Sequence, residues 1–365
     1  MADISFLKKL RIPKLSLFQS RSSGAVGIDI GTSSTKVVQL RYESERAILQ
    51  TYGELLNAGY LKKPEAPGTG FLRYLDSDIS ALVRDVLAGS NVTWREAIFA
   101  LPATSSFIIS IPFPLLSPGE IKDAIPYEAR KYIPIPISEV VLSWEILETQ
   151  RDRDIIEVLL VAVPREVVEK FKRIADGAKI KLQGLEVEPF SVVRALVGRD
   201  PTPTGVITMG RQSTNLAIAD RGKLTLSHNF SHGSQELTGA LERGLSVAGE
   251  RAELLKRDVG LSEKLEEKEI SSIISSLLDG LFGEIERVVA EYNHTHSRKI
   301  QKINLTGGGS NLRGIVELAA THFGIEVGRG NPFARLVTPP FMQPTLQEIG
   351  SSFSVAVGLA LRNMA

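Results

Sequence analysis

Apolar residues near the start of the chain are spaced first as in strands and then as in a helix. Residues 25–30 form an almost continuous apolar run, and residues 36–41 follow after a short polar turn, so two neighbouring strands are predicted. Residues 72–88 carry apolar side chains at helical intervals, and residues 97–101 form another short apolar run. Strands alternating with a helix are typical of α/β folds, and we predict a first lobe over residues 24–100.

The pattern changes after residue 101, where prolines interrupt short apolar runs. The predicted elements are strand 107–111, helix 117–132, strands 140–147 and 155–163, helix 164–178 and strand 182–187. Pro126 lies inside the first of these helices and should kink or shorten it, because proline has no N–H to donate. This order of elements predicts an α+β subdomain inserted over residues 101–186.

The remaining residues, 187–365, are predicted to form a second lobe. The predicted elements are helix 188–197, a hairpin of strands 205–219 and 223–230, helices 234–259 and 270–296, strand 303–306 and a C-terminal helix 353–362. The hairpin is expected to turn at Asp220-Arg221-Gly222, because glycine accepts the backbone angles of a tight turn. The fold class is therefore α/β with two lobes and one inserted subdomain.

Composition excludes several kinds of function. The 365 residues include no cysteine, which excludes disulfides, thiolate catalysis and cysteine-ligated zinc. The 43 Lys and Arg residues balance 42 Asp and Glu residues, so we expect no nucleic-acid partner. No apolar run reaches the length of about 20 residues that a membrane span needs. We therefore expect a cytoplasmic protein.

The first 23 residues combine apolar and basic side chains in an unusual way. The apolar members are Phe6, Leu7, Leu10, Ile12, Leu15, Leu17 and Phe18, and the basic members are Lys8, Lys9, Arg11, Lys14 and Arg21. Such a segment can lie on an anionic lipid surface or dock on a partner. A disordered tail before the first strand is the alternative interpretation. Peripheral placement at the inner face of the cytoplasmic membrane, through this tail or through a partner, is therefore a prediction.

Three glycine-centred turns carry the candidate chemistry. In the first, an apolar strand ends at Asp29 and is followed by a turn of Gly31, Thr32, Ser33, Ser34 and Thr35. Backbone N–H groups and hydroxyls in such a turn can cradle phosphate oxygens, and the carboxylate can hold a magnesium ion through water. An ordinary hairpin with a glycine turn is the alternative interpretation of this motif alone.

The second and third turns make the signal more specific. About 180 residues after the first turn, the second repeats the sequence of strand, glycine and small hydroxyl residues with Gly210, Arg211, Gln212, Ser213 and Thr214. The third follows a short strand and consists of Gly307, Gly308, Gly309 and Ser310, where the missing Cβ atoms let backbone approach a base or ribose. Three such turns in this order predict two similar halves facing one nucleotide.

With these turns the chain resembles the actin-like ATPase superfamily, and the inserted subdomain narrows the resemblance to the branch that contains FtsA and the PilM family of type IV pilus assembly proteins. The segment Pro126 to Pro136 is similar to the inserted-subdomain helix of the PilM family and its exit. Residues 227–238 are similar to the segment after its second phosphate loop, and residues 252–256 correspond to the place where the superfamily has a Glu and a Lys against the adenosine. The resemblance covers about residues 25 to 362. It implies an actin-like two-lobed fold whose C-terminal helix returns to the first lobe.

The resemblance implies ATP and Mg²⁺ as cofactors between the two lobes. The first and second turns would be phosphate loops, Asp29 would orient the metal, and Glu253, Lys256 and residues 307–310 would surround the nucleoside. A surface ion pair is the alternative interpretation for Glu253 and Lys256, which lie three apart on a predicted helix. Glu188 is a candidate catalytic residue that would polarise the attacking water, or else an acidic residue at a helix N-terminus.

One departure from the superfamily pattern concerns catalysis. The superfamily usually has Asp-X-Gly at the second phosphate loop, and this chain has Thr208-Met209-Gly210. A threonine hydroxyl brings no charge to orient magnesium or water, and phosphoryl transfer depends on positioning and electrostatics. We therefore expect ATP binding with slow or absent hydrolysis.

The resemblance also implies a protein partner. In PilM-like proteins the partner is the cytoplasmic N-terminal peptide of a membrane protein, PilN, which docks between the first lobe and the inserted subdomain. The expected groove runs along residues 103–111 and 121–135, although plain core packing is the alternative for any single residue. Self-association and a role in type II secretion instead of pilus assembly stay open.

Two other functional classes remain as alternatives. The first is a membrane-tethered, filament-forming division protein like FtsA. That family usually ends in an amphipathic membrane helix. Residues 361–365 do not have the pattern of such a helix, but the basic tail over residues 1–23 could take over its role. The second is a small-molecule kinase, for which we find no clear catalytic Asp motif.

Overall fold

The computed structural model describes residues 24–61, 70–116, 118–150 and 155–364. The predicted N-terminal tail, the loop over residues 62–69 and the turn over residues 151–154 lie outside the described residues. Within the described residues, no helix is both long and apolar enough to cross a lipid bilayer.

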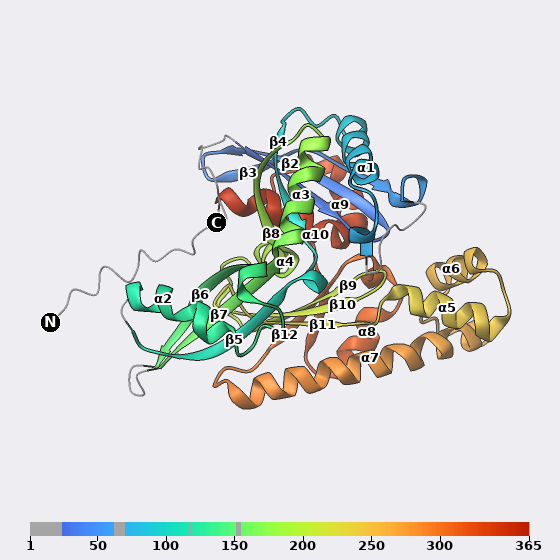
Figure 1. Ribbon diagram of the computed structural model, residues 1–365. Helices are drawn as coiled ribbons and strands as arrows, with labels where there is room; N and C mark the ends of the chain where they lie inside the picture. The colour runs from blue at the N-terminus through green and yellow to red at the C-terminus, as the bar shows by residue number, and fades with distance from the viewer. Residues whose placement is uncertain (1–23, 62–69, 117, 151–154, 365) are drawn as a thin grey trace.

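The first lobe is built on a five-stranded sheet in the order β3-β2-β1-β4-β8. Its strands are β1 (Gly24–Ile30), β2 (Ser34–Glu43), β3 (Arg46–Leu56), β4 (Glu96–Leu101) and β8 (Lys181–Val187). β1, β2 and β3 pair antiparallel, whereas β4 and β8 join in parallel. β1 is the central strand, between β2 and β4, and is therefore buried along its whole length. Helices α1 (Asp76–Gly89) and α3 (Arg165–Gly177) place Leu82, Phe171 and Ile174 in the core with this sheet (Figure 1).

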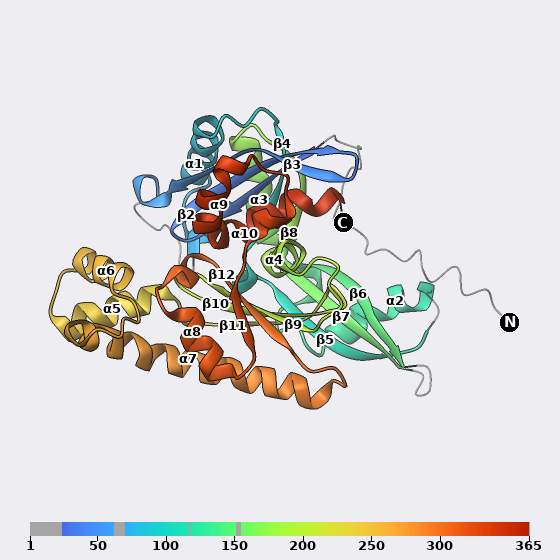
Figure 2. The same ribbon diagram turned by 180° about the vertical axis from the view of Figure 1, so that it is seen from behind.

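The second lobe repeats this arrangement. Its sheet has the order β11-β10-β9-β12-β13, again with three antiparallel strands followed by two parallel ones. The strands are β9 (Thr204–Met209), β10 (Thr214–Asp220), β11 (Lys223–Phe230), β12 (Lys302–Thr306) and β13 (Glu326–Arg329). Helices α7 (Lys268–Thr295) and α8 (Ile315–Phe323) lie along this sheet (Figure 2), and α5 (Ser234–Leu245) and α6 (Gly249–Asp258) follow the second glycine turn.

The third sheet is separate and has three strands in the order β5-β7-β6. Its strands are β5 (Phe107–Pro114), β6 (Val140–Gln150) and β7 (Ile155–Pro164), and helix α2 (Pro118–Ala129) packs Ile121 and Ile125 into their core. β8, which was predicted to complete this unit, pairs instead with β4 of the first sheet. We therefore propose a smaller inserted unit, close to residues 103–164, than the 101–186 of the sequence prediction.

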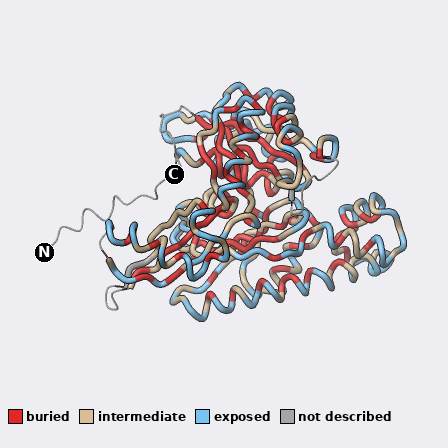
Figure 3. Tube along the Cα trace, viewed as in Figure 1, coloured by how far each residue is buried: buried red, intermediate tan, exposed pale blue. Residues whose placement is uncertain are grey.

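Two helices connect the lobes. α4 (Glu188–Leu196) and α10 (Ser354–Ala360) cross closely, and a Cβ on Gly358 would lie 1.9 Å from the carbonyl oxygen of Ser191. α10 also touches β1, because a Cβ on Gly27 would lie 2.2 Å from the Ala356 carbonyl oxygen. The C-terminal helix therefore packs on the first sheet, and the buried stretches of chain in Figure 3 concentrate in the sheets and these two helices.

Three local predictions differ from the structure. β3 was missed because its residues mix polar and apolar side chains, as expected of a strand at the edge of a sheet. The helix predicted over residues 234–259 is two helices, because Ser246 adopts a left-handed conformation that ends α5. α2 continues through Pro126 and ends three residues later at Ala129, before the predicted end at residue 132.

Candidate functional site

The first two glycine turns have the same backbone geometry. Each lies between the first two strands of its sheet, β1 and β2 in one lobe and β9 and β10 in the other. The Gly31 N–H donates to the Ser34 carbonyl at 3.1 Å, and the Gly210 N–H donates to the Ser213 carbonyl at 2.9 Å. The sequence repeat is therefore a structural repeat as well.

The first turn exposes only part of its predicted set of ligands. Thr32 is exposed and Ser33 is half-buried, so these residues remain accessible to a ligand. Ser34 and Thr35 are buried, and their hydroxyls donate to Glu54 Oε1 and to Asn57 Oδ1. Both hydroxyls therefore serve to build the turn.

The second turn divides in the same way. Arg211 and Gln212 are exposed and Ser213 is half-buried, whereas Thr214 is buried and its hydroxyl donates to the His232 carbonyl at 2.7 Å. The Arg211 Nε donates to Gln235 Oε1 at 3.2 Å, which places this cation at the start of α5.

The third turn packs against the second. Gly307 has a φ of 81°, and a Cβ on it would lie 2.5 Å from the Met209 carbonyl oxygen, so only glycine fits there without strain. A Cβ on Gly309 would meet the Met209 side chain at 2.8 Å, whereas a Cβ on Gly308 would meet nothing within 4 Å. The buried Ser310 hydroxyl donates to the Gly307 carbonyl at 2.7 Å. Of these four residues, Gly308 is the exposed one.

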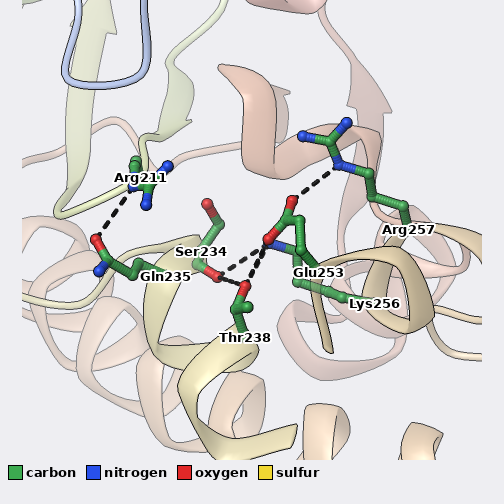
Figure 4. A network of polar contacts seen from close by, with 7 residues as sticks. All are labelled: Arg211, Ser234, Gln235, Thr238, Glu253, Lys256 and Arg257. Carbon is green, nitrogen blue, oxygen red and sulfur yellow. Dashed lines mark hydrogen bonds and ion pairs between the residues drawn. The ribbon is translucent and has the colours of Figure 1, made fainter. Parts of the chain in front are cut away.

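Glu253 and Lys256 form the centre of a network between α5 and α6 (Figure 4). The Lys256 ammonium contacts Glu253 at 2.6 Å, the Thr238 hydroxyl at 2.9 Å and the Ser234 carbonyl at 3.2 Å. The ion pair of the alternative interpretation is present, but Lys256 is only 7% exposed, so the pair is partly buried. Burial lowers the pKa of Lys256, and Glu253 opposes that shift.

Asp29 is buried and Glu188 is half-buried, and the two carboxyl groups influence each other's ionisation. Burial raises the pKa of Asp29 to about 6, while Lys36 acts against this shift and Glu54 adds to it. Burial and the neighbouring Asp29 raise the pKa of Glu188 to about 8, although the Ala103 N–H donates to its carboxylate at 3.2 Å. Glu188 is also the first residue of α4, as the interpretation of an acidic residue at a helix N-terminus expects, and its role toward an attacking water stays a prediction.

Oxygen ligands of this kind fit a magnesium ion. Each carboxylate disfavours ionisation of the other in the absence of a cation, and a divalent cation would reverse that effect. Perturbed carboxyl groups in a cleft are typical of functional sites.

The structure adds three residues that the sequence analysis missed. Lys36 contacts both the Ser34 hydroxyl at 2.7 Å and the Glu54 carboxylate at 3.2 Å. Asn57, just after β3, is 3% exposed and bonds to the first turn. Recognising β3 in the sequence would have placed Glu54 and Asn57 beside that turn.

Interactions among these groups relate the turns to one another. Burial raises the pKa of Glu54, but Lys36, Ser34 and Arg257 of α6 outweigh burial and lower it, so a charge on α6 acts on a residue beside the first turn. Arg257 also contacts Glu253 at 2.8 Å. The third turn reaches the second through Met209.

The acidic pair predicts how stability depends on pH. Because the folded protein keeps a proton on Glu188 that the unfolded chain loses above its ordinary pKa of 4.5, stability falls as pH rises through about 8. We expect Glu188→Gln to raise the melting temperature at pH 8.5 in the absence of nucleotide and metal, and to change it little at pH 4.5. The stabilisation should be at least about 1 kcal/mol.

A pH series of melting curves checks this prediction. Glu263→Gln, which alters an exposed carboxyl group, serves as the matched control and should show no such pH dependence. Equal effects of Glu188→Gln at both pH values would show that the proton is not held in the folded state.

Two lobes with matching five-stranded sheets and paired glycine turns define a protein of the actin-like fold. MreB5 of Spiroplasma citri bound to AMPPNP shares this fold, with a TM-score of 0.52 and 12% identity over 93% of this chain and 95% of that one. More specifically, the family model of the type IV pilus assembly protein PilM matches residues 27–364, and the chain belongs to this family. The predicted fold class and family are confirmed.

Two further relatives agree with this assignment. A solved PilM–PilN type IV pilus biogenesis complex matches with a TM-score of 0.81 and 25% identity, covering 95% of this chain and 100% of that chain. The cell division protein FtsA of Enterococcus hirae is 22% identical over 387 residues, covering 91% of this chain and 86% of that protein. The predicted FtsA-like branch of the superfamily is therefore also confirmed.

Proposed function

We propose that the protein is an ATP-binding scaffold of the type IV pilus assembly platform that binds the N-terminal peptide of a PilN-like membrane protein. The observation that carries the proposal is the pair of glycine turns with the same hydrogen bond, 3.1 Å in one lobe and 2.9 Å in the other, in a chain of the PilM family. A nucleotide held by both turns would favour one arrangement of the lobes over others.

The nucleotide would be held by exposed parts of the three turns. The first and second turns offer Thr32, Ser33, Arg211, Gln212 and Ser213 to the phosphates, and Gly308 offers open space for the nucleoside. Asp29, with Glu188 nearby, would hold Mg²⁺, which neutralises phosphate charge. Lys36 adds a cation beside the first turn.

We propose slow or absent ATP hydrolysis. In this proposal Glu188 would orient the attacking water, but Thr208 of β9 supplies no second carboxylate to help it, and without a cation burial and Asp29 raise the pKa of Glu188 to about 8. A steady-state assay with saturating ATP and Mg²⁺ should give less than about 1 turnover per second, the lower end of the kinase range. A rate within that range would contradict this part of the proposal.

We propose a narrower peptide groove than the one expected from the sequence. Ile121, Ile125, Ala129 and Ile133 are buried against the three-stranded sheet, so these side chains are core residues. On β5, Phe107 and Ile109 point to one face and are 37% and 36% exposed, at the end of the strand that leads from the first lobe. We propose that this apolar face receives the peptide.

Titration of a synthetic PilN N-terminal peptide tests the proposed partner. Phe107→Asp places a charge in the proposed contact and should weaken peptide binding at least about tenfold, the equivalent of about 1.4 kcal/mol. Phe341→Asp, at a distant and 81% exposed position, is the matched control and should bind as the wild type does. Equal binding of the peptide by the wild type, Phe107→Asp and Phe341→Asp would exclude the β5 face as the peptide-binding surface.

Localisation follows from the partner in this proposal. Binding to the cytoplasmic peptide of a membrane protein would keep the chain at the inner face of the membrane, with or without the tail over residues 1–23. The FtsA-like alternative is not favoured, because its match of 22% identity is weaker support than a family model over residues 27–364.

A further inference from the structure

Asn57 makes three hydrogen bonds to the first glycine turn from a position just after β3. Its Nδ2 donates to the Gly31 carbonyl at 2.8 Å, its backbone N–H donates to the Ser33 carbonyl at 2.9 Å, and its Oδ1 accepts from the Thr35 hydroxyl at 3.1 Å. Because Asn57 is 3% exposed and Thr35 is fully buried, these bonds are shielded from water. One side chain therefore fixes both ends of the turn.

The second turn is fixed by the same pattern of bonds without an asparagine. The Ser234 backbone N–H donates to the Gly210 carbonyl at 3.0 Å, as Asn57 Nδ2 does to Gly31. The Thr214 hydroxyl donates to the His232 carbonyl at 2.7 Å, as Thr35 does to Asn57 Oδ1. The carboxamide of Asn57 thus takes the place that backbone groups at the start of α5 occupy in the other lobe.

These bonds determine the direction of the backbone N–H groups. In a trans peptide the C=O and the following N–H point in opposite directions. Holding the Gly31 carbonyl against Asn57 therefore turns the N–H of the exposed Thr32 away from Asn57. In the second turn the Ser234 N–H holds the Gly210 carbonyl, and the N–H of Arg211 is turned away from Ser234 in the same way.

We propose that Asn57 is a positioning residue that presets the first turn so that its N–H groups meet the polyphosphate of a bound nucleotide. The proposal rests on the proposed nucleotide site and adds the residue that prepares half of it. Preorganised N–H donors bind anions without the cost of ordering the loop. Asn57 should therefore act on the phosphates of the ligand and leave recognition of the nucleoside unchanged.

Calorimetric titration of the full chain with ATP and Mg²⁺, and separately with adenosine, tests this role. Asn57→Asp keeps the size and the acceptor for Thr35 but places a carboxylate oxygen against the Gly31 carbonyl. We expect ATP affinity to fall about tenfold or more, the usual consequence of one lost buried donor, with adenosine affinity unchanged.

Two variants at Thr35 extend the test. Thr35→Val removes only the hydroxyl that bonds to Asn57 and should also weaken ATP more than adenosine, whereas Thr35→Ser keeps the hydroxyl and should restore ATP affinity. If Asn57→Asp does not fold, the comparison of Thr35→Val with Thr35→Ser still tests whether the bond between residues 35 and 57 supports ATP binding.

The possible results separate this inference from the proposed function. Equal weakening of ATP and adenosine, or unchanged ATP affinity in Asn57→Asp and Thr35→Val, would overturn the positioning role while the nucleotide site stands. A wild-type chain that takes up no ATP would overturn the proposed function and this role together.

Discussion

Replacing Gly358 with alanine is expected to destabilise the protein by about 3 kcal/mol, the upper part of the usual range for overpacking. The new Cβ would lie 1.9 Å from the Ser191 carbonyl oxygen and 2.4 Å from its carbonyl carbon. These are backbone atoms of α4, so α10 and α4 must move apart to accept the methyl group. The loss should appear in chemical denaturation as a lower free energy of unfolding.

Gly280→Ala is the matched control for this prediction. Gly280 is exposed within α7, and a Cβ there would meet nothing within 4 Å. Alanine is the better helix former, so this change should stabilise the protein by about 0.5–1 kcal/mol. Similar effects of the two substitutions would show that α4 and α10 do not cross as closely as described.

Replacing Gly308 with phenylalanine should abolish most ATP binding and leave stability almost unchanged. A Cβ at Gly308 meets no atom within 4 Å, so the ring would extend into the space proposed for the nucleoside. Steric conflict of about 1–3 kcal/mol corresponds to about five- to 150-fold weaker binding. Calorimetry with ATP and a melting curve measure the two effects separately.

Substitutions of two other glycines, one next to Gly308 and one far from it in the sequence, serve as comparisons for Gly308→Phe. Gly307→Ala should lower both stability and ATP affinity, because residue 307 has a φ of 81° and lies against Met209. Gly328→Phe on β13 adds the same ring at another open position and should leave ATP affinity unchanged. A loss of binding in Gly328→Phe as large as in Gly308→Phe would contradict the proposed nucleoside site.

The sequence predicted those parts of the fold that strong local patterns determine. The apolar run of β1, the hairpin with Arg221 and Gly222 at positive φ and the strongly amphipathic α3 were all found from periodicity and turn residues. β3 was missed, because an edge strand needs few apolar residues. The true partner of β8 could not be read from the sequence, since strand pairing depends on the whole chain.

In the candidate site, too, some features could be predicted from the sequence and others could not. Glycines mark the three turns in the sequence, so the turns were predictable. The roles of Asn57 and Glu54 were not, because they depend on contacts across 20 or more residues. The burial of the Ser34, Thr35 and Ser310 hydroxyls likewise depends on which side of each turn faces the protein.

The central claim is that the cleft between the two lobes binds one adenine nucleotide through these turns. Calorimetric titration of the full chain with ATP in the presence of Mg²⁺ tests it most directly. Saturable uptake of one nucleotide per chain is expected, and Gly308→Phe should weaken it about five- to 150-fold without unfolding the protein. No uptake of ATP or ADP by the folded wild-type chain would contradict it.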